Sequence, residues 1–231
     1  MQPRLSSIAL FLGLSSIACG APAQENRESD VIPLPDVRVE SSLSVEEALA
    51  GRRSIRSYGA EALSLAELSQ VLWAAQGVTE RIEETPEGFS WEWRGGLRTA
   101  PSAGALYPLE VYVVVGDVEG LEAATYRYLP VEHALEPAIP GDLRTALSRA
   151  AHGQNVIRTA PAVLAIGGAV ARTAAKYGER AEQYVLIEVG AAAENVFLQC
   201  ESLGLATVLV GAFVDQEVKT VLRLPDGEEA Y

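Results

Sequence analysis

Two short clusters hold the residues whose types and spacing could do chemistry. The first contains Arg52, Arg53 and Arg56, three arginines within five positions of a chain whose net charge is −13. Guanidinium groups bind phosphate oxygens through paired hydrogen bonds, so this segment could hold a phosphate-bearing ligand. The alternative is a solvated basic loop that balances nearby acidic residues. Taken alone, the segment favours this alternative.

The second cluster is the small-residue loop, residues 101–105, with the sequence Pro-Ser-Ala-Gly-Ala. Side chains this small leave backbone N–H groups uncovered, so a flat or anionic ligand could approach the main chain. A tight turn ahead of a strand has the same composition, and the loop alone does not separate the two interpretations.

The elements that must position these clusters follow from apolar patterns and helix signals. The apolar run at 111–115, closed by Gly116, predicts a strand buried on both faces. Ser44 with Glu47, and Ser64 with Glu67, form capping boxes that predict two helix starts. Further elements are expected at 125–135 (a hairpin around Pro130), 141–151 and 214–222 (helices), 162–166 and 207–210 (strands), and 179–203 (a long helix ended by Gly204). Because strands and helices do not alternate regularly, we expect an α+β fold.

Composition limits the function classes. The chain has 231 residues, of which 48% are hydrophobic and 21% charged, as expected of a globular domain. A net charge of −13 argues against nucleic acid as a partner. The only cysteines are Cys19 and Cys200, and there are two histidines, so neither a metal site nor a cysteine nucleophile is expected.

The N-terminus has the pattern of an export signal over residues 1–23. Arg4 supplies the positive charge, and an apolar stretch begins at residue 8. Two cleavage patterns stay open: Ser16-Ile17-Ala18-Cys19, which resembles a lipobox with Cys19 as the lipidated residue, and Ala21-Pro22-Ala23. Both predict an exported protein of the periplasm or cell envelope, with membrane contact only through a lipid on Cys19. Residues 24–43 are predicted to be a linker or an extended arm, and 44–231 the domain.

These segments together resemble the FMN-dependent nitroreductase family, and within it the SagB/ThcOx-type dehydrogenases. The resemblance covers residues 44–231 and is strongest at 101–112, Pro-Ser-Ala-Gly-Ala-Leu-Tyr-Pro-Leu-Glu-Val-Tyr. The other matching motifs are Arg52-Arg53-Ser54-x-Arg56-x-Tyr58, Lys176-Tyr177-Gly178-x-Arg180, and Glu188-x-Gly190-Ala191-Ala192-x-Glu194-Asn195 with Leu203-Gly204-Leu205.

The resemblance implies a central, mostly antiparallel sheet flanked by helices, in a homodimer that binds FMN at the subunit interface. It implies an oxidoreductase that moves two electrons through the flavin, acts on a small molecule or a peptide, and can use NAD(P)H. By motif match, the phosphate is held by Arg52, Arg53, Ser54 and Arg56, the flavin ring lies along Pro101, Ser102, Ala103 and Ala105, and the backbone of Val210 and Gly211 faces flavin N5.

The resemblance also implies catalytic roles for Lys176 and Tyr177. A lysine beside an apolar flavin face could act as a base, and the tyrosine could donate a hydrogen bond to a substrate heteroatom. The alternative is a surface cation beside a tyrosine that packs against the long helix. Family members usually continue past the position of Tyr231 into a strand and a basic tail that reaches the phosphate. With the export signal, this difference leaves a second function open: a flavin-poor, catalytically inactive interaction module of the cell envelope.

Overall fold

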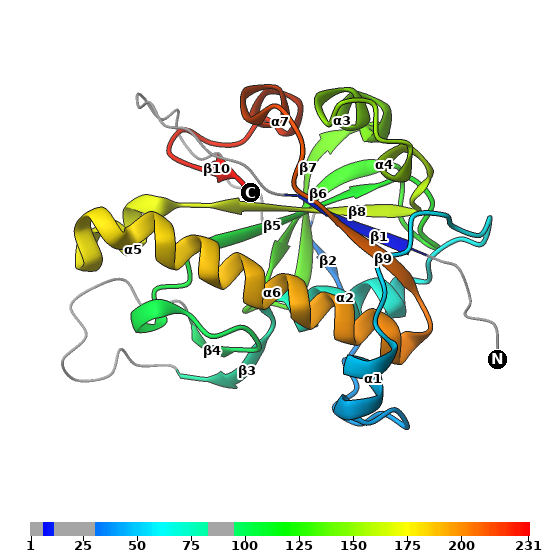
Figure 1. The fold of residues 1–231 in the computed structure, drawn as a ribbon, viewed down its shortest axis with the longest axis horizontal. Helices are drawn as coiled ribbons and strands as arrows, with labels where there is room; N and C mark the ends of the chain where they lie inside the picture. Colours follow the sequence, from blue (N-terminus) through cyan, green and yellow to red (C-terminus); the bar gives the residue numbers. More distant parts are fainter. Residues whose placement is uncertain (1–6, 12–30, 83–94) are drawn as a thin grey trace.

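A computed structural model describes residues 7–11, 31–82 and 95–231 as three layers, with one large sheet between two groups of helices (Figure 1). The sheet has eight strands, seven of which follow one path. In spatial order these are β2 (Ile32–Pro33), β7 (Ala134–Pro140), β6 (Ala124–Leu129), β5 (Leu109–Val115), β8 (Ala162–Gly168), β1 (Ser7–Phe11) and β9 (Ala206–Val210). The eighth strand, β10 (Glu229–Ala230), pairs with the end of β8.

Most strand pairs are antiparallel, which confirms the predicted α+β class. The neighbours from β2 to β8 all pair antiparallel, and so do β10 and β8. Only β1 is parallel to its neighbours, β8 and β9. All seven residues of β5 are buried, as its uninterrupted apolar run predicts.

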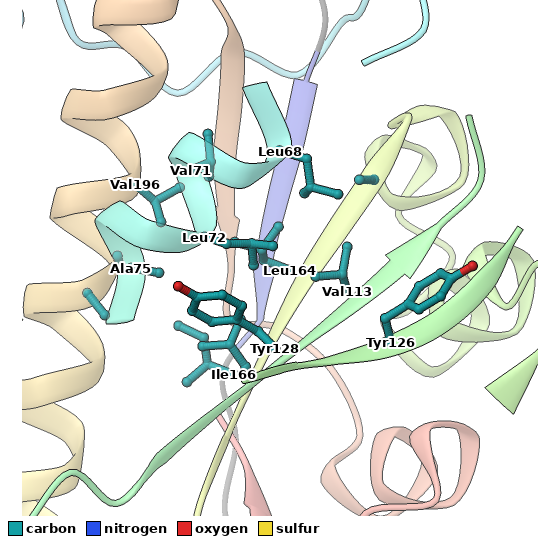
Figure 2. Packing of buried hydrophobic residues seen from close by; sticks show 14 of the residues in the cluster. Leu68, Val71, Leu72, Ala75, Val113, Tyr126, Tyr128, Leu164, Ile166 and Val196 are labelled. Atoms are coloured by element: carbon teal, nitrogen blue, oxygen red, sulfur yellow. The ribbon is translucent and has the colours of Figure 1, made fainter. Parts of the chain in front are cut away.

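Helices cover both faces of the sheet. One face carries α2 (Leu65–Gln76), α6 (Ala181–Leu203) and, packed on α6, α1 (Val45–Gly51). The other carries α3 (Arg144–Ala150), α4 (Asn155–Thr159) and α7 (Asp215–Leu222). Figure 2 shows the first interface, where Leu68 and Leu72 of α2 approach Val113 and Leu164 of the sheet. Burying each such side chain stabilises the fold by about 1.5–3 kcal/mol.

Both predicted capping boxes are present. Ser44 and Ser64 each accept a hydrogen bond from the backbone of the glutamate three residues later, and each glutamate side chain accepts one in return. Gly77 ends α2 as predicted, but its φ of −65° is not left-handed. A Cβ there would lie 2.1 Å from Trp73 Cδ1, so close approach explains the glycine.

The structure adds elements that the sequence patterns did not predict. The helix α5 (Val170–Tyr177) and the 3₁₀ turn Gly178–Arg180 precede α6. A small second sheet pairs β3 (Val78–Arg81) with β4 (Gly96–Arg98). Residues 83–94, part of the aromatic loop 80–96, lie outside the described residues.

The predicted arm packs on the domain over residues 31–43. Leu34 is buried, Arg38 N donates to Gln70 Oε1 (2.8 Å), and Gln70 Nε2 donates back to Arg38 O (3.0 Å). Ser7–Phe11, within the predicted export signal, forms β1. Cys19 and both cleavage patterns lie outside the described residues. Among the helices described, none has the length and apolarity to span a membrane.

Candidate functional site

The small-residue loop adopts a backbone that needs support. It joins β4 to β5 and contains a single 3₁₀ turn, Ala103–Ala105. Gly104, Ala105 and Tyr107 have φ of 64°, 54° and 45°. The left-handed region is costly for residues other than glycine, so the surroundings must hold Ala105 and Tyr107 in place.

Hydrogen bonds around Tyr107 provide that support. Its backbone N donates to Ser102 Oγ (2.9 Å), and its hydroxyl accepts from Arg98 N (3.2 Å). The Arg98 guanidinium lies 4.7 Å from the centre of the Tyr107 ring. Arg172 Nη1 donates to Tyr107 O (3.2 Å). The loop is therefore fastened to β4 and α5.

Lys176 and Tyr177 lie against this loop. A Cβ on Gly104 would be 2.9 Å from the Tyr177 hydroxyl and 3.0 Å from Lys176 Nζ. Lys176 Nζ lies 5.5 Å from the centre of the Tyr177 ring, which packs edge-on against Tyr184 of α6 at 4.8 Å. Tyr177 therefore packs on the long helix and also reaches the loop, so the two interpretations of this pair are compatible.

The arginine segment lies beside β9. Ser54 forms a parallel bridge with Thr207, and Ile55 N donates to Thr207 O (2.9 Å). The strand then ends at Val210, and Gly211 follows it exposed. This pairing places the first motif next to the strand that carries Val210 and Gly211 toward the helix face.

The three guanidinium groups have different surroundings. Arg52 lies 5.3 Å from the centre of the Phe197 ring on α6. Arg53 Nη1 donates to the carbonyls of Ala50 (3.0 Å), Gly51 (3.3 Å) and Arg52 (2.7 Å), so it caps the end of α1. Arg56 is exposed. A helix-capping role for Arg53 was not predicted.

The predicted site residues thus form two groups along α6 (Figure 1). The loop group, Pro101 to Ala105 with Lys176 and Tyr177, lies near Tyr184. The arginine group, Arg52 to Arg56 with Val210 and Gly211, lies near Phe197. At 1.5 Å of rise per residue, Tyr184 and Phe197 are about 20 Å apart along the helix.

A buried polar cluster beside the loop was not predicted. Gln76, Arg98 and Glu188 are 0%, 8% and 2% exposed. Arg98 Nη1 donates to Gln76 Oε1 (2.9 Å), and Gln76 Nε2 donates to Glu188 Oε1 (3.5 Å). The sequence did carry a signal, because helical spacing places Glu188 on the same face as the apolar Val185 and Ala192.

Burial raises the pKa of Glu188 to about 7. Hydrogen bonds from Ser102 and Gln76 and the charges of Arg98 and Arg172 act against this rise. No group of three or more histidine, cysteine, aspartate or glutamate side chains in the described parts of the chain could hold a metal ion.

Comparison with known proteins identifies the family. The family model described as "Nitroreductase family" matches residues 49–231. "Putative nitroreductase MJ1384" of Methanocaldococcus jannaschii is 42% identical over 195 residues, which are 84% of this chain and 90% of that protein. The chain belongs to the nitroreductase family, a family of oxidoreductases.

Solved structures agree with this assignment. The crystal structure of a protein of Ralstonia eutropha described as a "putative nitroreductase" has a TM-score of 0.71 and 30% identity, with 95% of this chain and 94% of that chain covered. The microcin B17-processing protein McbC of Escherichia coli is 30% identical over 133 residues, 55% of this chain and 48% of McbC, which supports the SagB/ThcOx-type branch. The E. coli McbBCD complex with truncated pro-MccB17 bound shares the fold, with a TM-score of 0.59, 21% identity, and coverage of 95% of this chain and 73% of that chain.

Proposed function

We propose that this protein is an FMN-dependent oxidoreductase that takes two electrons from a reduced donor such as NAD(P)H and passes them to a small organic molecule or a peptide. The observation that carries the proposal is the contact of Lys176 and Tyr177 with the loop at Gly104. It brings a cation and a hydroxyl to a stretch of main chain that no large side chain covers, which suits a flat ligand with a reactive edge.

The residues present fit FMN in the chemistry of their donors. Arg52, Ser54 and Arg56 offer guanidinium and hydroxyl groups for a phosphate. The backbone N–H groups of Val210 and Gly211 offer donors at the end of a strand. Bound FMN supplies the two-electron chemistry, and preplaced donors stabilise the negative charge that develops during hydride transfer.

Flavin content tests this proposal directly. We expect purified protein to be yellow, or to become so on addition of FMN, and to lose its visible absorbance when dithionite is added. A colourless protein that takes up no FMN would rule the proposal out. Replacement of both Arg52 and Arg56 by alanine should weaken FMN binding at least tenfold, because each removes a charge-assisted contact with the phosphate.

The role of Lys176 is separable from flavin binding. Lys176→Ala should keep bound FMN and lose turnover with the donor. Lys176→Arg keeps the positive charge but cannot act as a base, because guanidinium does not deprotonate in proteins. Recovery in the arginine variant would favour charge over proton transfer, and unchanged turnover in the alanine variant would remove Lys176 from the mechanism.

We further propose that two copies of the chain build each site. The loop group and the arginine group lie about 20 Å apart along α6, a distance that an antiparallel second copy would close. The same helix layer exposes apolar side chains and carries a groove of about 800 Å³ lined by α1, α2, α6 and the arm. The exposed apolar residues on this layer are Val45 and Leu49 on α1, Leu97 on β4, and Leu186 and Ile187 on α6.

Mixed dimers test the shared site. One copy carries Arg52→Ala with Arg56→Ala, and the other carries Ala103→Trp, so that each homodimer fails to hold FMN. In a two-fold dimer with shared sites, every mixed dimer regains one intact site, and random exchange should restore about a quarter of the wild-type FMN content. No recovery, with mixed dimers present, would mean that each chain builds its own site.

We also propose that the protein is exported to the periplasm or cell envelope. The support is the sequence pattern of residues 1–23. Cys19→Ser tests the two cleavage patterns, since it should abolish lipid labelling and membrane association only if the lipobox is used. An uncleaved protein that fractionates with the cytosol would overturn the proposal.

One contact favours the alternative function, a flavin-poor interaction module. Arg53 is occupied by three carbonyls at the end of α1 and is less available to a phosphate than the motif predicts. Calorimetry with FMN separates the functions. Micromolar or tighter binding supports the enzyme, and no heat at any pH supports the module.

A further inference from the structure

Glu188 connects the buried cluster to the loop through Ser102. The Ser102 side chain is a hydrogen-bond partner of the Glu188 carboxyl group. Its oxygen also accepts a hydrogen bond from Tyr107 N (2.9 Å). A hydroxyl has one hydrogen to donate, so a Ser102 that accepts from Tyr107 donates to Glu188. The path from Glu188 through Ser102 to Tyr107 therefore closes the stretch that holds the left-handed Gly104 and Ala105.

We propose that Glu188 is a positioning residue, whose ionised carboxylate orients the Ser102 hydroxyl and thereby fixes the loop backbone on which the flavin would lie. When Glu188 takes up a proton, it has fewer acceptor sites for Ser102 and Gln76, and the loop loosens. The inference deepens the proposed function, on which it rests only for the identity of the ligand.

The groups that face Glu188 come from four elements. Arg98 of β4 and Arg172 of α5 carry positive charge, the loop contributes Ser102 and Tyr107, and α2 contributes the neutral Gln76. Burial opposes ionisation, while both arginines favour it. These opposed effects leave the pKa of Glu188 at about 7, so the change of charge falls within the physiological range.

Hydrogen exchange of the Tyr107 amide reads the loop without any substrate. In the full chain as purified, we expect the protection of this amide to rise about tenfold between pH 6 and pH 8, after correction for intrinsic exchange. Glu188→Gln should show equal protection at both pH values. Glu188→Ala should lose about tenfold of the protection at pH 8, the loss expected for one hydrogen bond to a charged group.

Two further variants keep this test decisive. Ser102→Ala breaks the same link without altering α6, so it should lower Tyr107 protection at both pH values even if the Glu188 variants fold poorly. Glu182→Gln removes an exposed charge from the same helix and should match wild type. A pH-dependent rise that persists in Glu188→Gln, or Tyr107 protection unchanged in Ser102→Ala, would overturn the inference.

FMN affinity gives a second measurement. The dissociation constant of wild type should fall severalfold from pH 6 to pH 8, and that of Glu188→Gln should stay constant. If wild type binds no FMN, the proposed function fails, while the exchange of Tyr107 still decides the role of Glu188. If FMN binds and Tyr107 protection does not change with pH, the inference alone fails.

Discussion

Gly104 is the residue at which the loop and the Lys176–Tyr177 pair meet. It has a φ of 64°, and a Cβ there would lie within 3.0 Å of both side-chain tips. Gly104→Ala should therefore lower the free energy of unfolding by more than the about 1–2 kcal/mol that left-handed alanine costs, because the two side chains must also move. Urea unfolding measures the difference.

Gly153 provides the matched control for that substitution. Its φ of 75° is similarly left-handed, but a Cβ there would meet nothing within 4 Å. Gly153→Ala isolates the backbone cost. Equal losses in the two variants would show that Lys176 and Tyr177 do not press on the loop.

His133 makes stability depend on pH. The sequence suggests an exposed hairpin residue, but the ring is half-buried: its Nδ1 pairs with the Tyr128 hydroxyl (2.9 Å), and its Nε2 lies 2.8 Å from Ser69 Oγ and 3.1 Å from Pro35 O. Burial lowers the pKa of His133, although the Pro35 contact and Asp36 act in the opposite direction.

The sign of the effect follows from that lowered pKa. The unfolded chain takes up the proton at about pH 6.5, while the folded chain still resists it. The contribution of His133 is therefore complete above about pH 6.5 and is lost as the pH falls toward its folded pKa. Urea unfolding at pH 7.5 and pH 5.5 should show a smaller loss in His133→Asn, which tolerates the φ of 49°. The same pH dependence in both proteins would contradict the assignment.

The sequence identified the site residues by type but not their partners. The resemblance named Ser102 and Lys176, and local spacing flagged Arg53. It could not reveal that Arg53 caps α1, that Ser102 contacts Glu188, or that Gly104 separates Lys176 from the loop backbone by the width of one hydrogen atom. Such contacts join positions far apart in the chain, and they depend on packing that one-dimensional patterns do not contain.

The two capping boxes share one sequence pattern but protect different elements. Eight residues of α2 are buried, whereas α1 buries only Ala48. Ser64→Ala should therefore lower global stability by about 1 kcal/mol. Ser44→Ala should cost less, because α1 can fray without opening the core. Denaturant titrations of both variants test this order, which equal losses would contradict.

Element prediction succeeded where one signal was strong and local. The run at 111–115 and the caps at Ser44 and Ser64 gave a buried strand and two helix starts. The helix α5 was missed because only Thr173 within it is buried, so no apolar stripe marks it. Its place against α6 arises from tertiary contacts such as the Tyr177–Tyr184 pair.

At the scale of the whole molecule, the arm tests the predicted boundary at residue 44. A chain that starts at residue 31 keeps β2, buried Leu34 and the paired hydrogen bonds of Arg38 with Gln70. A chain that starts at residue 44 loses them and should be less stable by about 3 kcal/mol, from one buried side chain and two hydrogen bonds. Both chains lack residues 7–11, so the comparison isolates the arm. Equal unfolding midpoints would restore the boundary at 44.

The strand β1 has a consequence for the order of events in the cell. Ser7–Phe11 is hydrogen-bonded on one side to β8 and on the other to β9, deep among the other strands. A translocation machine must grip that same stretch while it is still bare. Secretion would therefore have to win a race against folding, and a chain that closed its sheet first would stay on the side of the membrane where it was made.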